Sequence, residues 1–127
     1  MSTIPVKRVL VVGGGIGGMA SAILLRRLGV AVDLVELDPR WQVYGAGITL
    51  SAVTMRALVS LGFSKQLQAR GFCGNGMDLF AADGTHLFTR DSPRLSGPDE
   101  PSVGGIMRPV LREILATAMA HSKTAVP

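Results

Sequence analysis

The stretch that decides the fold lies near the N-terminus and reads Val9-Leu10-Val11-Val12-Gly13-Gly14-Gly15-Ile16-Gly17-Gly18. An apolar run is followed at once by glycines in the spacing G-x-G-x-x-G, formed by Gly13, Gly15 and Gly18. In this pattern the first glycine permits a tight turn after a strand, and the second lets the backbone approach a pyrophosphate. The third lets the next helix lie close to the strand. The stretch therefore predicts a strand, a phosphate-binding turn and the start of a helix.

The flanking residues supply the rest of a β-α-β unit. Residues 7–12 are rich in valine, which is typical of a strand covered on both faces. From residue 17 to residue 28 apolar residues recur at helical spacing, and Gly29 follows as the residue expected just past a helix end. Residues 30–35 form a second apolar run. Together they predict a dinucleotide site in which the positive end of the helix dipole faces the pyrophosphate. The glycine pattern taken alone is equally compatible with a flexible loop.

Glu36 comes directly after the second apolar run. Its distance from the glycines is close to the roughly 20 residues that separate such a turn from the acid that holds a ribose hydroxyl. A solvated carboxylate at a strand end is the simpler alternative, but the placement of Glu36 after Leu34 and Val35 favours the ribose role. A carboxylate at this point repels a 2′-phosphate, so the residue argues against NADP and leaves FAD and NAD open.

Length, charge and cysteine content exclude several classes of protein. The 127 residues are enough for one domain at most, and the formal net charge is +4. The 13 basic residues stand singly or in pairs without interleaved aromatic residues, so we expect a solvated surface and no nucleic-acid partner. Cys73 is the only cysteine, which excludes an internal disulfide and a multi-cysteine metal site and fits a reducing compartment.

The hydrophobic segments are short. The first residues lack the apolar core of a signal peptide, and no apolar run approaches the roughly 20 residues of a membrane span. We therefore expect a soluble, cytoplasmic protein with no membrane contact.

The remaining sequence predicts short helices and a hairpin. The predicted elements are a helix capped by Ser51 and running to Leu61, a shorter helix capped by Ser64 and ending at Gly71, strands over residues 75–80 and 86–90 on either side of Asp83-Gly84, a loop over residues 91–105, and a helix opened by Pro109. His86 is then a strand residue and His121 lies at the end of the last helix. Neither histidine has a second metal ligand or a nucleophile at a sequence spacing typical of a site, so no catalytic residue and no metal ligand is assigned.

The predicted strands leave the sheet unfinished. Only two parallel strands are visible, whereas a doubly wound sheet needs several. A sheet of two parallel strands leaves strand edges and helix faces uncovered. The sequence therefore predicts an α/β fold with an incomplete Rossmann-like β-α-β domain, and we expect the chain to be the front part of a larger protein.

Three further motifs, in order along the chain, carry a family resemblance. They are Val43-Tyr44-Gly45-Ala46-Gly47-Ile48, the helix around Met55-Arg56-Ala57-Leu58, and Arg108-Pro109-Val110-Leu111 followed by Leu115. Together with the glycine turn and Glu36, they make nearly the whole chain resemble the class A flavoprotein monooxygenases, the para-hydroxybenzoate hydroxylase family. One position departs from the family pattern: Gln42 stands where the family often has an arginine.

The resemblance implies a cofactor, a set of binding residues and a division of the chain. The cofactor is FAD, and the implied binding residues are Gly13, Gly14, Gly15, Ile16, Gly17, Gly18, Glu36, Leu37, Gln42, Gly47 and Arg108. Residues 1–71 would form the N-terminal part of the FAD-binding domain and residues 72–107 the start of a β-rich substrate domain. Residues 108–127 would return to the FAD-binding domain.

The implied activity is hydroxylation of a small aromatic substrate with O₂, with NADH or NADPH as transient reductant, and an oligomer is compatible with it. Two alternatives stay open. An NAD-dependent dehydrogenase module shares the glycine turn and the acid, and a truncated, non-catalytic dinucleotide-binding fragment would share them too. We expect the 127-residue chain alone to be inactive.

Overall fold

A computed structural model describes residues 6–40 and 45–121. The chain divides into two compact units. The first unit is formed by Met1–Gly45 and Arg108–Pro127, and the second by Ala46–Met107. The predicted boundary after residue 71 does not coincide with this division, because strands on either side of that residue pair with the same third strand. The assignment of residues 72–107 to a substrate domain stays a prediction.

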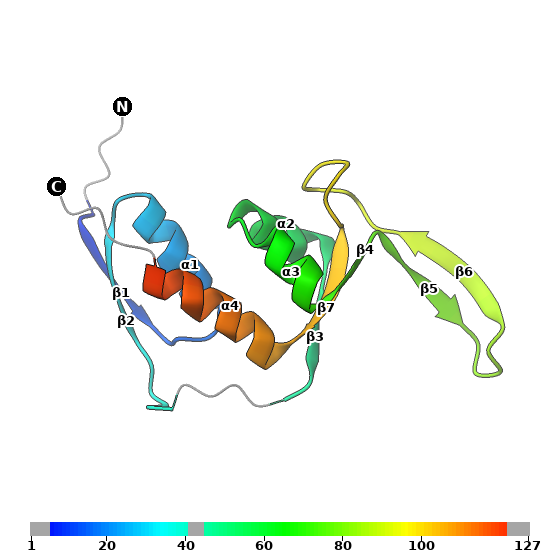
Figure 1. The fold of residues 1–127 in the computed structure, drawn as a ribbon, viewed down its shortest axis with the longest axis horizontal. Coiled ribbons are helices and arrows are strands. Elements are labelled where there is room, and N and C mark those ends of the chain that lie inside the picture. The colour runs from blue at the N-terminus through cyan, green and yellow to red at the C-terminus, as the bar shows by residue number, and fades with distance from the viewer. Residues whose placement is uncertain (1–5, 41–44, 122–127) are drawn as a thin grey trace. The chain divides into compact units, whose positions relative to one another are not determined.

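The first unit is a β-α-β unit with one additional helix (Figure 1). Its elements are β1 (Arg8–Val12), α1 (Ile16–Arg27), β2 (Ala31–Val35) and α4 (Arg108–His121). β1 and β2 pair in parallel, with Arg8 opposite Ala31 and Val12 opposite Val35. The predicted strand, helix, strand and final helix are confirmed to within one residue at each end that was predicted, because the signals that define them are local: an apolar run, helical periodicity and a glycine stop.

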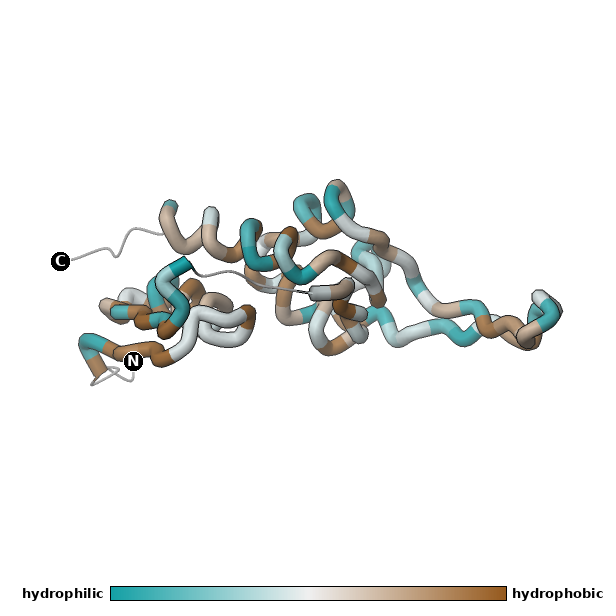
Figure 2. The backbone as a smooth tube through the Cα atoms, turned by 90° about the horizontal axis from the view of Figure 1, so that it is seen from below, coloured by the Kyte–Doolittle hydropathy of each residue, from teal (hydrophilic) through white to brown (hydrophobic). Residues whose placement is uncertain are grey.

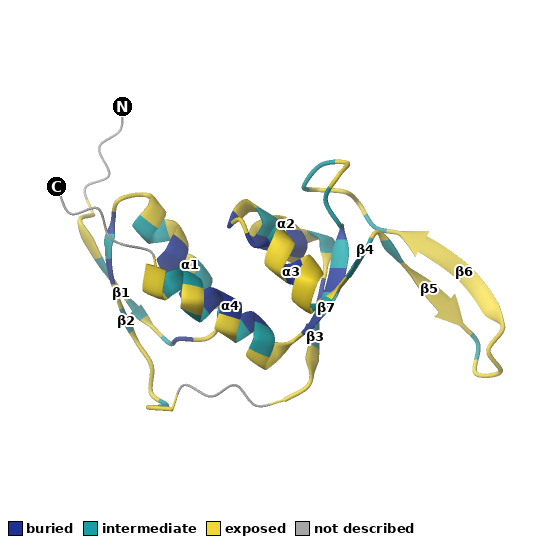
Figure 3. Ribbon diagram, viewed as in Figure 1, coloured by how far each residue is buried: buried dark blue, intermediate teal, exposed yellow. Residues whose placement is uncertain are grey.

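The core of the first unit lies between α1 and the elements packed against it. Met19, Ala22 and Ile23 of α1 are buried, as are Leu111 and Leu115 of α4 (Figure 3). α1 and α4 pack against each other, and α1 also covers β2. α1 therefore covers one face of the parallel pair, and α4 packs on α1.

The other face of β1 is open, which corrects the expectation of a strand covered on both sides. Leu10 is 60% exposed and Val12 is 79% exposed, and the apolar run that contains them is brown in Figure 2. The reason is geometric: side chains alternate across a strand, and α1 covers only one face. On the open face the Arg8 guanidinium donates two hydrogen bonds to the Asp33 carboxylate, with 2.6 and 3.0 Å between the heavy atoms.

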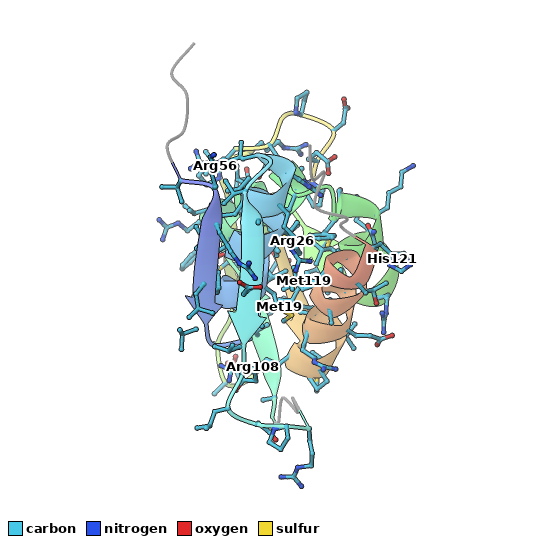
Figure 4. All side chains as sticks on the ribbon, turned by 90° about the vertical axis from the view of Figure 1, so that its left-hand side faces the viewer. Met19, Arg26, Arg56, Arg108, Met119 and His121 are labelled. Carbon is cyan, nitrogen blue, oxygen red and sulfur yellow. The ribbon has the colours of Figure 1, made fainter. Side chains whose placement is uncertain are left out.

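Arg26 connects three elements of the first unit. Its guanidinium donates to the backbone carbonyl of Met119 at 2.9 Å and to that of Val32 at 3.2 Å. Figure 4 shows Arg26 beside Met119. Carbonyls near a helix C-terminus lack partners within the helix, and a cation there also suits the helix dipole. Arg26, near the C-terminal end of α1, therefore reaches the end of α4.

The second unit combines a three-stranded sheet, two helices and a hairpin. Its elements are β3 (Gly47–Leu50), α2 (Ala52–Ser60), α3 (Ser64–Arg70), β4 (Phe72–Gly74), β5 (Gly76–Phe80), β6 (His86–Asp91) and β7 (Val103–Met107). The sheet has the order β3-β7-β4, with both pairings antiparallel, and β5 and β6 form a separate hairpin. The core residues include Leu50, Met55, Leu58, Leu67 and Ile106. The hairpin is exposed along its length (Figure 3).

Two predictions in the second unit are wrong. The loop expected over residues 91–105 ends in a strand, β7, and β4 was not predicted at all. The glycines that suggested a loop are required for close packing: a Cβ on Gly104 would lie 2.8 Å from the carbonyl oxygen of Phe72. The pairing of β7 with β3 and β4 is non-local, so no short-range pattern reveals it.

The helix caps gave one confirmed and one wrong prediction. Ser51 caps α2, and its hydroxyl accepts the N–H of Thr54 at 3.5 Å. Ser64 is instead the first residue of α3, and Phe63 holds the cap position. The Ser64 hydroxyl is engaged elsewhere, because it donates to the carboxylate of Glu100.

Candidate functional site: the glycine turn of the first unit

The turn between β1 and α1 depends on two glycines. Gly13 has φ +99°, a backbone conformation that L side chains rarely adopt, and its N–H donates to the Val35 carbonyl at 2.8 Å. A Cβ on Gly18 would lie 1.9 Å from the carbonyl oxygen of Gly13. The close approach of helix to strand that the sequence assigned to Gly18 is therefore confirmed.

The start of α1 presents backbone donors. The helix begins at Ile16, with Gly15 at the cap position in an extended conformation and no side chain serving as a cap. At the start of the helix, the Met19 N–H donates to the Gly15 carbonyl at 2.9 Å. The N–H groups of Ile16, Gly17 and Gly18 thus precede the first donor with an intrahelical partner. No acidic residue lies in the first turn, so the dipole favours an external anion here.

Glu36 lies directly beside this turn. Its Oε2 accepts the N–H of Gly14 at 2.6 Å, and its Oε1 accepts the N–H of Asp38 at 3.1 Å. These backbone donors, that of Asp38 first and that of Gly14 second, lower the pKa of Glu36 below its ordinary value. The carboxylate is therefore ionised near neutral pH.

A hollow of about 360 Å³ opens at the carboxyl ends of the two parallel strands. It is lined by Val12, Gly13, Val35, Glu36 and Leu37. Leu37 is 95% exposed, so the hollow has an apolar rim beside its acidic group. Crevices at the carboxyl ends of parallel strands are where α/β folds bind ligands.

The structure brings some of the predicted residues together and not others. Gly13, Glu36 and Leu37 line the hollow, and Gly14 is hydrogen-bonded to Glu36. The residues from Gly15 to Gly18 form the adjoining helix start. Val12 and Val35 also line the hollow and were not predicted to do so, although both stand at the carboxyl end of a predicted strand.

The other three predicted residues lie elsewhere in the chain. Arg108 is the first residue of α4 and is exposed, toward the end of the first unit where β1 and β2 finish (Figures 1 and 4). Gly47 begins β3 in the second unit, where it lines an open hollow of about 500 Å³ with Thr49, Phe72 and Met107. Gln42 lies outside the described residues.

The sequence also matches a known family. Residues 7–123 match the family described as FAD binding domain. The chain belongs to this family. An FAD-binding domain accounts for the glycine turn and for the acid after β2, and the match favours FAD over the NAD of a dehydrogenase module as the ligand of the site.

Curated relatives of this FAD-binding domain are monooxygenases. The chain is 39% identical over 64 residues to the FAD-dependent monooxygenase pynG of Aspergillus niger, which covers 50% of this chain and 15% of that protein. It is 42% identical over 62 residues to the 3-hydroxybenzoate 6-hydroxylase of Polaromonas naphthalenivorans, covering 49% of this chain and 16% of the relative. The matched segment is thus about a sixth of each relative's length.

Solved structures show the same fold. The p-nitrophenol 4-monooxygenase PnpA of Pseudomonas putida aligns with a TM-score of 0.77 and 18% identity over 94% of this chain and 30% of its own. The tetrameric form of 2-methyl-3-hydroxypyridine-5-carboxylic acid oxygenase aligns with a TM-score of 0.74 and 20% identity over 97% of this chain and 31% of its own. The predicted α/β FAD-binding fold is therefore confirmed.

Within residues 6–40 and 45–121, no group of three or more His, Cys, Asp or Glu side chains is placed to hold a metal ion. Over the same ranges, no helix combines the length and the apolar character that crossing a bilayer requires.

Proposed function

We propose that the protein carrying this chain is an FAD-dependent monooxygenase that hydroxylates a small aromatic substrate, with NADH or NADPH as reductant and O₂ as co-substrate. The names of the relatives support the aromatic substrate: they include a 3-hydroxybenzoate 6-hydroxylase and a 6-hydroxynicotinate 3-monooxygenase. The observation that carries the proposal is the glycine turn with Glu36 beside it, in a chain of the FAD-binding family.

The site fits the adenosine diphosphate half of FAD. The open space around Gly15, where an added Cβ would meet nothing within 4 Å, leaves room for a pyrophosphate against the backbone. The N–H groups at the start of α1 would receive its charge, and Glu36 would accept hydroxyl hydrogens of the ribose. Val12 and Leu37, both exposed at the hollow, would lie against the apolar parts of the adenosine.

The remaining predicted residues belong to the same proposal. Arg108 would contact a phosphate or a polar edge of the flavin, because a guanidinium donates to both. Gly47 would lie along the flavin, and Gln42 would donate a hydrogen bond without a charge. Residues 1–71 and 108–127 would belong to the FAD-binding domain and residues 72–107 to the start of a substrate domain.

When bound, FAD supplies the electron transfer between the nicotinamide reductant and O₂ and the transfer of oxygen to the ring. The residues of this chain would bind and orient the cofactor, and none of them is assigned a catalytic role. The cytoplasm is the proposed location, since a single cysteine fits a reducing compartment.

The experiment uses the purified protein that carries this chain. Its FAD content is measured, and oxidation of NADH and of NADPH is followed with and without a panel of hydroxylated benzoates and pyridines. A monooxygenase binds FAD, oxidises the reductant faster when a substrate is present, and releases a product with one added oxygen atom. Binding of NAD without FAD would favour the dehydrogenase alternative, and FAD binding with no reductant oxidation would favour a non-catalytic module.

A further inference from the structure

Both oxygens of the Glu36 carboxylate are already engaged by the protein. Oε2 accepts from the N–H of Gly14 at 2.6 Å and Oε1 accepts from the N–H of Asp38 at 3.1 Å. Gly14 is buried in the turn after β1, and Asp38 lies in the segment after β2. One side chain therefore joins the two segments that border the proposed site.

A second bond runs alongside the first. The N–H of Gly13 donates to the carbonyl of Val35, the last residue of β2, at 2.8 Å. Consecutive N–H groups of the turn are thus held by consecutive residues, Val35 and Glu36. Of these two bonds, only the one to Glu36 depends on a side chain, and it is a charge-assisted bond of the kind that exceeds a neutral one in strength.

We infer that Glu36 is a positioning residue for the glycine turn, which it holds in its binding conformation before any cofactor arrives. This inference rests on the proposed function and assigns the residue a role in addition to the ribose contact. The two roles are compatible, because each carboxylate oxygen has two lone pairs and accepts a hydroxyl hydrogen as well as a backbone N–H.

The positioning role determines which N–H groups remain for the pyrophosphate. The N–H of Gly14 is directed at a carboxylate of the protein, so the pyrophosphate would be received by the N–H groups further along, at the start of α1. A turn fixed in advance loses less conformational entropy on binding, which strengthens binding of any ligand that uses the turn. Loss of Glu36 should therefore weaken the binding even of a ligand that has no ribose hydroxyls.

A ligand without those hydroxyls separates the two roles. The FAD-free protein is titrated calorimetrically with ADP and with 2′,3′-dideoxy-ADP, for the unaltered protein, for Glu36→Gln and for Glu36→Asp. Glu36→Gln removes the charge, and Glu36→Asp keeps the charge on a side chain one methylene too short for the same contact. Asp83→Asn is the matched control, because Asp83 is also an exposed carboxylate that accepts a backbone N–H, from Thr85 at 2.9 Å, but in the second unit.

The positioning role predicts that both Glu36 variants bind dideoxy-ADP about three- to tenfold more weakly, whereas Asp83→Asn does not change its affinity. A residue that acts on the ribose alone gives the opposite result for Glu36→Gln. Removing a negative charge near an anionic ligand would then leave dideoxy-ADP affinity unchanged or raise it, which would overturn the inference. Failure of the unaltered protein to bind ADP at all would contradict the proposed function instead.

A measurement without ligand completes the test, and its first part uses the unaltered protein alone. Hydrogen exchange of the FAD-free, unaltered protein should show protection in the peptide spanning residues 9–19, and exchange there should be about tenfold faster in Glu36→Gln. Unprotected exchange in the unaltered protein would overturn the positioning role, whatever the titrations show.

Discussion

At the scale of single residues, the site depends on a carboxylate beside a glycine turn. Glu36 accepts backbone N–H groups from Gly14 and Asp38, and the turn itself requires the positive φ of Gly13. The Glu36 carboxylate offers a negative charge to hydroxyl donors, and the start of α1 beside it offers the N–H groups of Ile16, Gly17 and Gly18 to an anion. Adenosine diphosphate presents both kinds of group close together.

Glu36→Ala in the intact protein should weaken FAD binding roughly ten- to hundredfold, because charge-assisted hydrogen bonds to the ribose are lost together with the support of the turn. The dissociation constant is measured by quenching of flavin fluorescence. Unchanged FAD affinity would show that Glu36 does not belong to the site. Asp83→Asn again serves as the control.

The affinity for FAD should also fall at acidic pH. The pKa of Glu36 is lowered from its ordinary value of 4.5 by the backbone donors of Asp38 and Gly14, so the ionised form is the one that the folded protein stabilises. In the folded protein the carboxylate stays ionised down to the lowered pKa, and its contribution to FAD binding is lost as the pH falls through that value. FAD affinity titrated from pH 7 downward should therefore stay level to below pH 4.5, the ordinary pKa of the group, and fall only as the lowered pKa of Glu36 is crossed. Glu36→Gln should abolish this component, and an identical profile in that variant would contradict the assignment.

Sequence alone predicted the turn but not its hydrogen bonds. The roles of Gly13 and Gly18 follow from spacing, because they concern a backbone that runs from strand to helix over a few residues. The bond between Glu36 and Gly14 joins residues 22 positions apart and depends on a side-chain conformation. No periodicity reveals such a bond.

At the scale of elements, Arg26 secures α1 to β2 and to the end of α4. Its guanidinium donates to the carbonyls of Val32 and Met119. The arginine therefore supports the packing of the helix whose N-terminus faces the site, although it lies near the opposite end of that helix.

Arg26→Gln should destabilise the first unit by about 1.5–3 kcal/mol, since hydrogen bonds from a charged donor to two carbonyls are lost. Thermal or urea unfolding measures the change. Arg27→Gln, at the exposed neighbouring position, should cost less. Equal losses for the two variants would mean that Arg26 acts only through surface charge.

The elements also show where sequence patterns stop being informative. β1, α1 and β2 were predicted nearly to the residue, because each is defined by its own residues and because a glycine closely follows β1 and α1. β7 was taken for part of a loop, because it contains Gly104 and Gly105 and because its partners, β3 and β4, lie far away in the sequence. Residue types that are typical of loops serve close strand packing there.

At the scale of the whole molecule, apolar surface remains open in both units. The open face of β1 exposes Leu10 and Val12, and the hairpin exposes Met77, Phe80 and Leu87. The parallel sheet of the described residues has two strands, which is a small platform for a dinucleotide. The fold of an FAD-binding domain is therefore present with much of its apolar surface in contact with solvent.

The 127 residues expressed alone should not hold FAD tightly and should self-associate, because exposed patches of this kind promote association. Size-exclusion chromatography and absorbance in the flavin band measure both properties, and NAD(P)H oxidation is assayed with added FAD. A soluble, yellow monomer that oxidises NAD(P)H would contradict this prediction.

The central claim is that the glycine turn binds the pyrophosphate of FAD, and Gly15→Val tests it most directly. An added Cβ at Gly15 meets nothing within 4 Å and the backbone there is extended, so the substitution leaves the fold intact and fills only the space proposed for the ligand. The measurement is an FAD titration of the intact protein and of the variant, with circular dichroism to confirm folding. The account predicts a yellow protein with one FAD per chain and a folded, colourless variant. A folded Gly15→Val variant that binds FAD with unchanged affinity would contradict it.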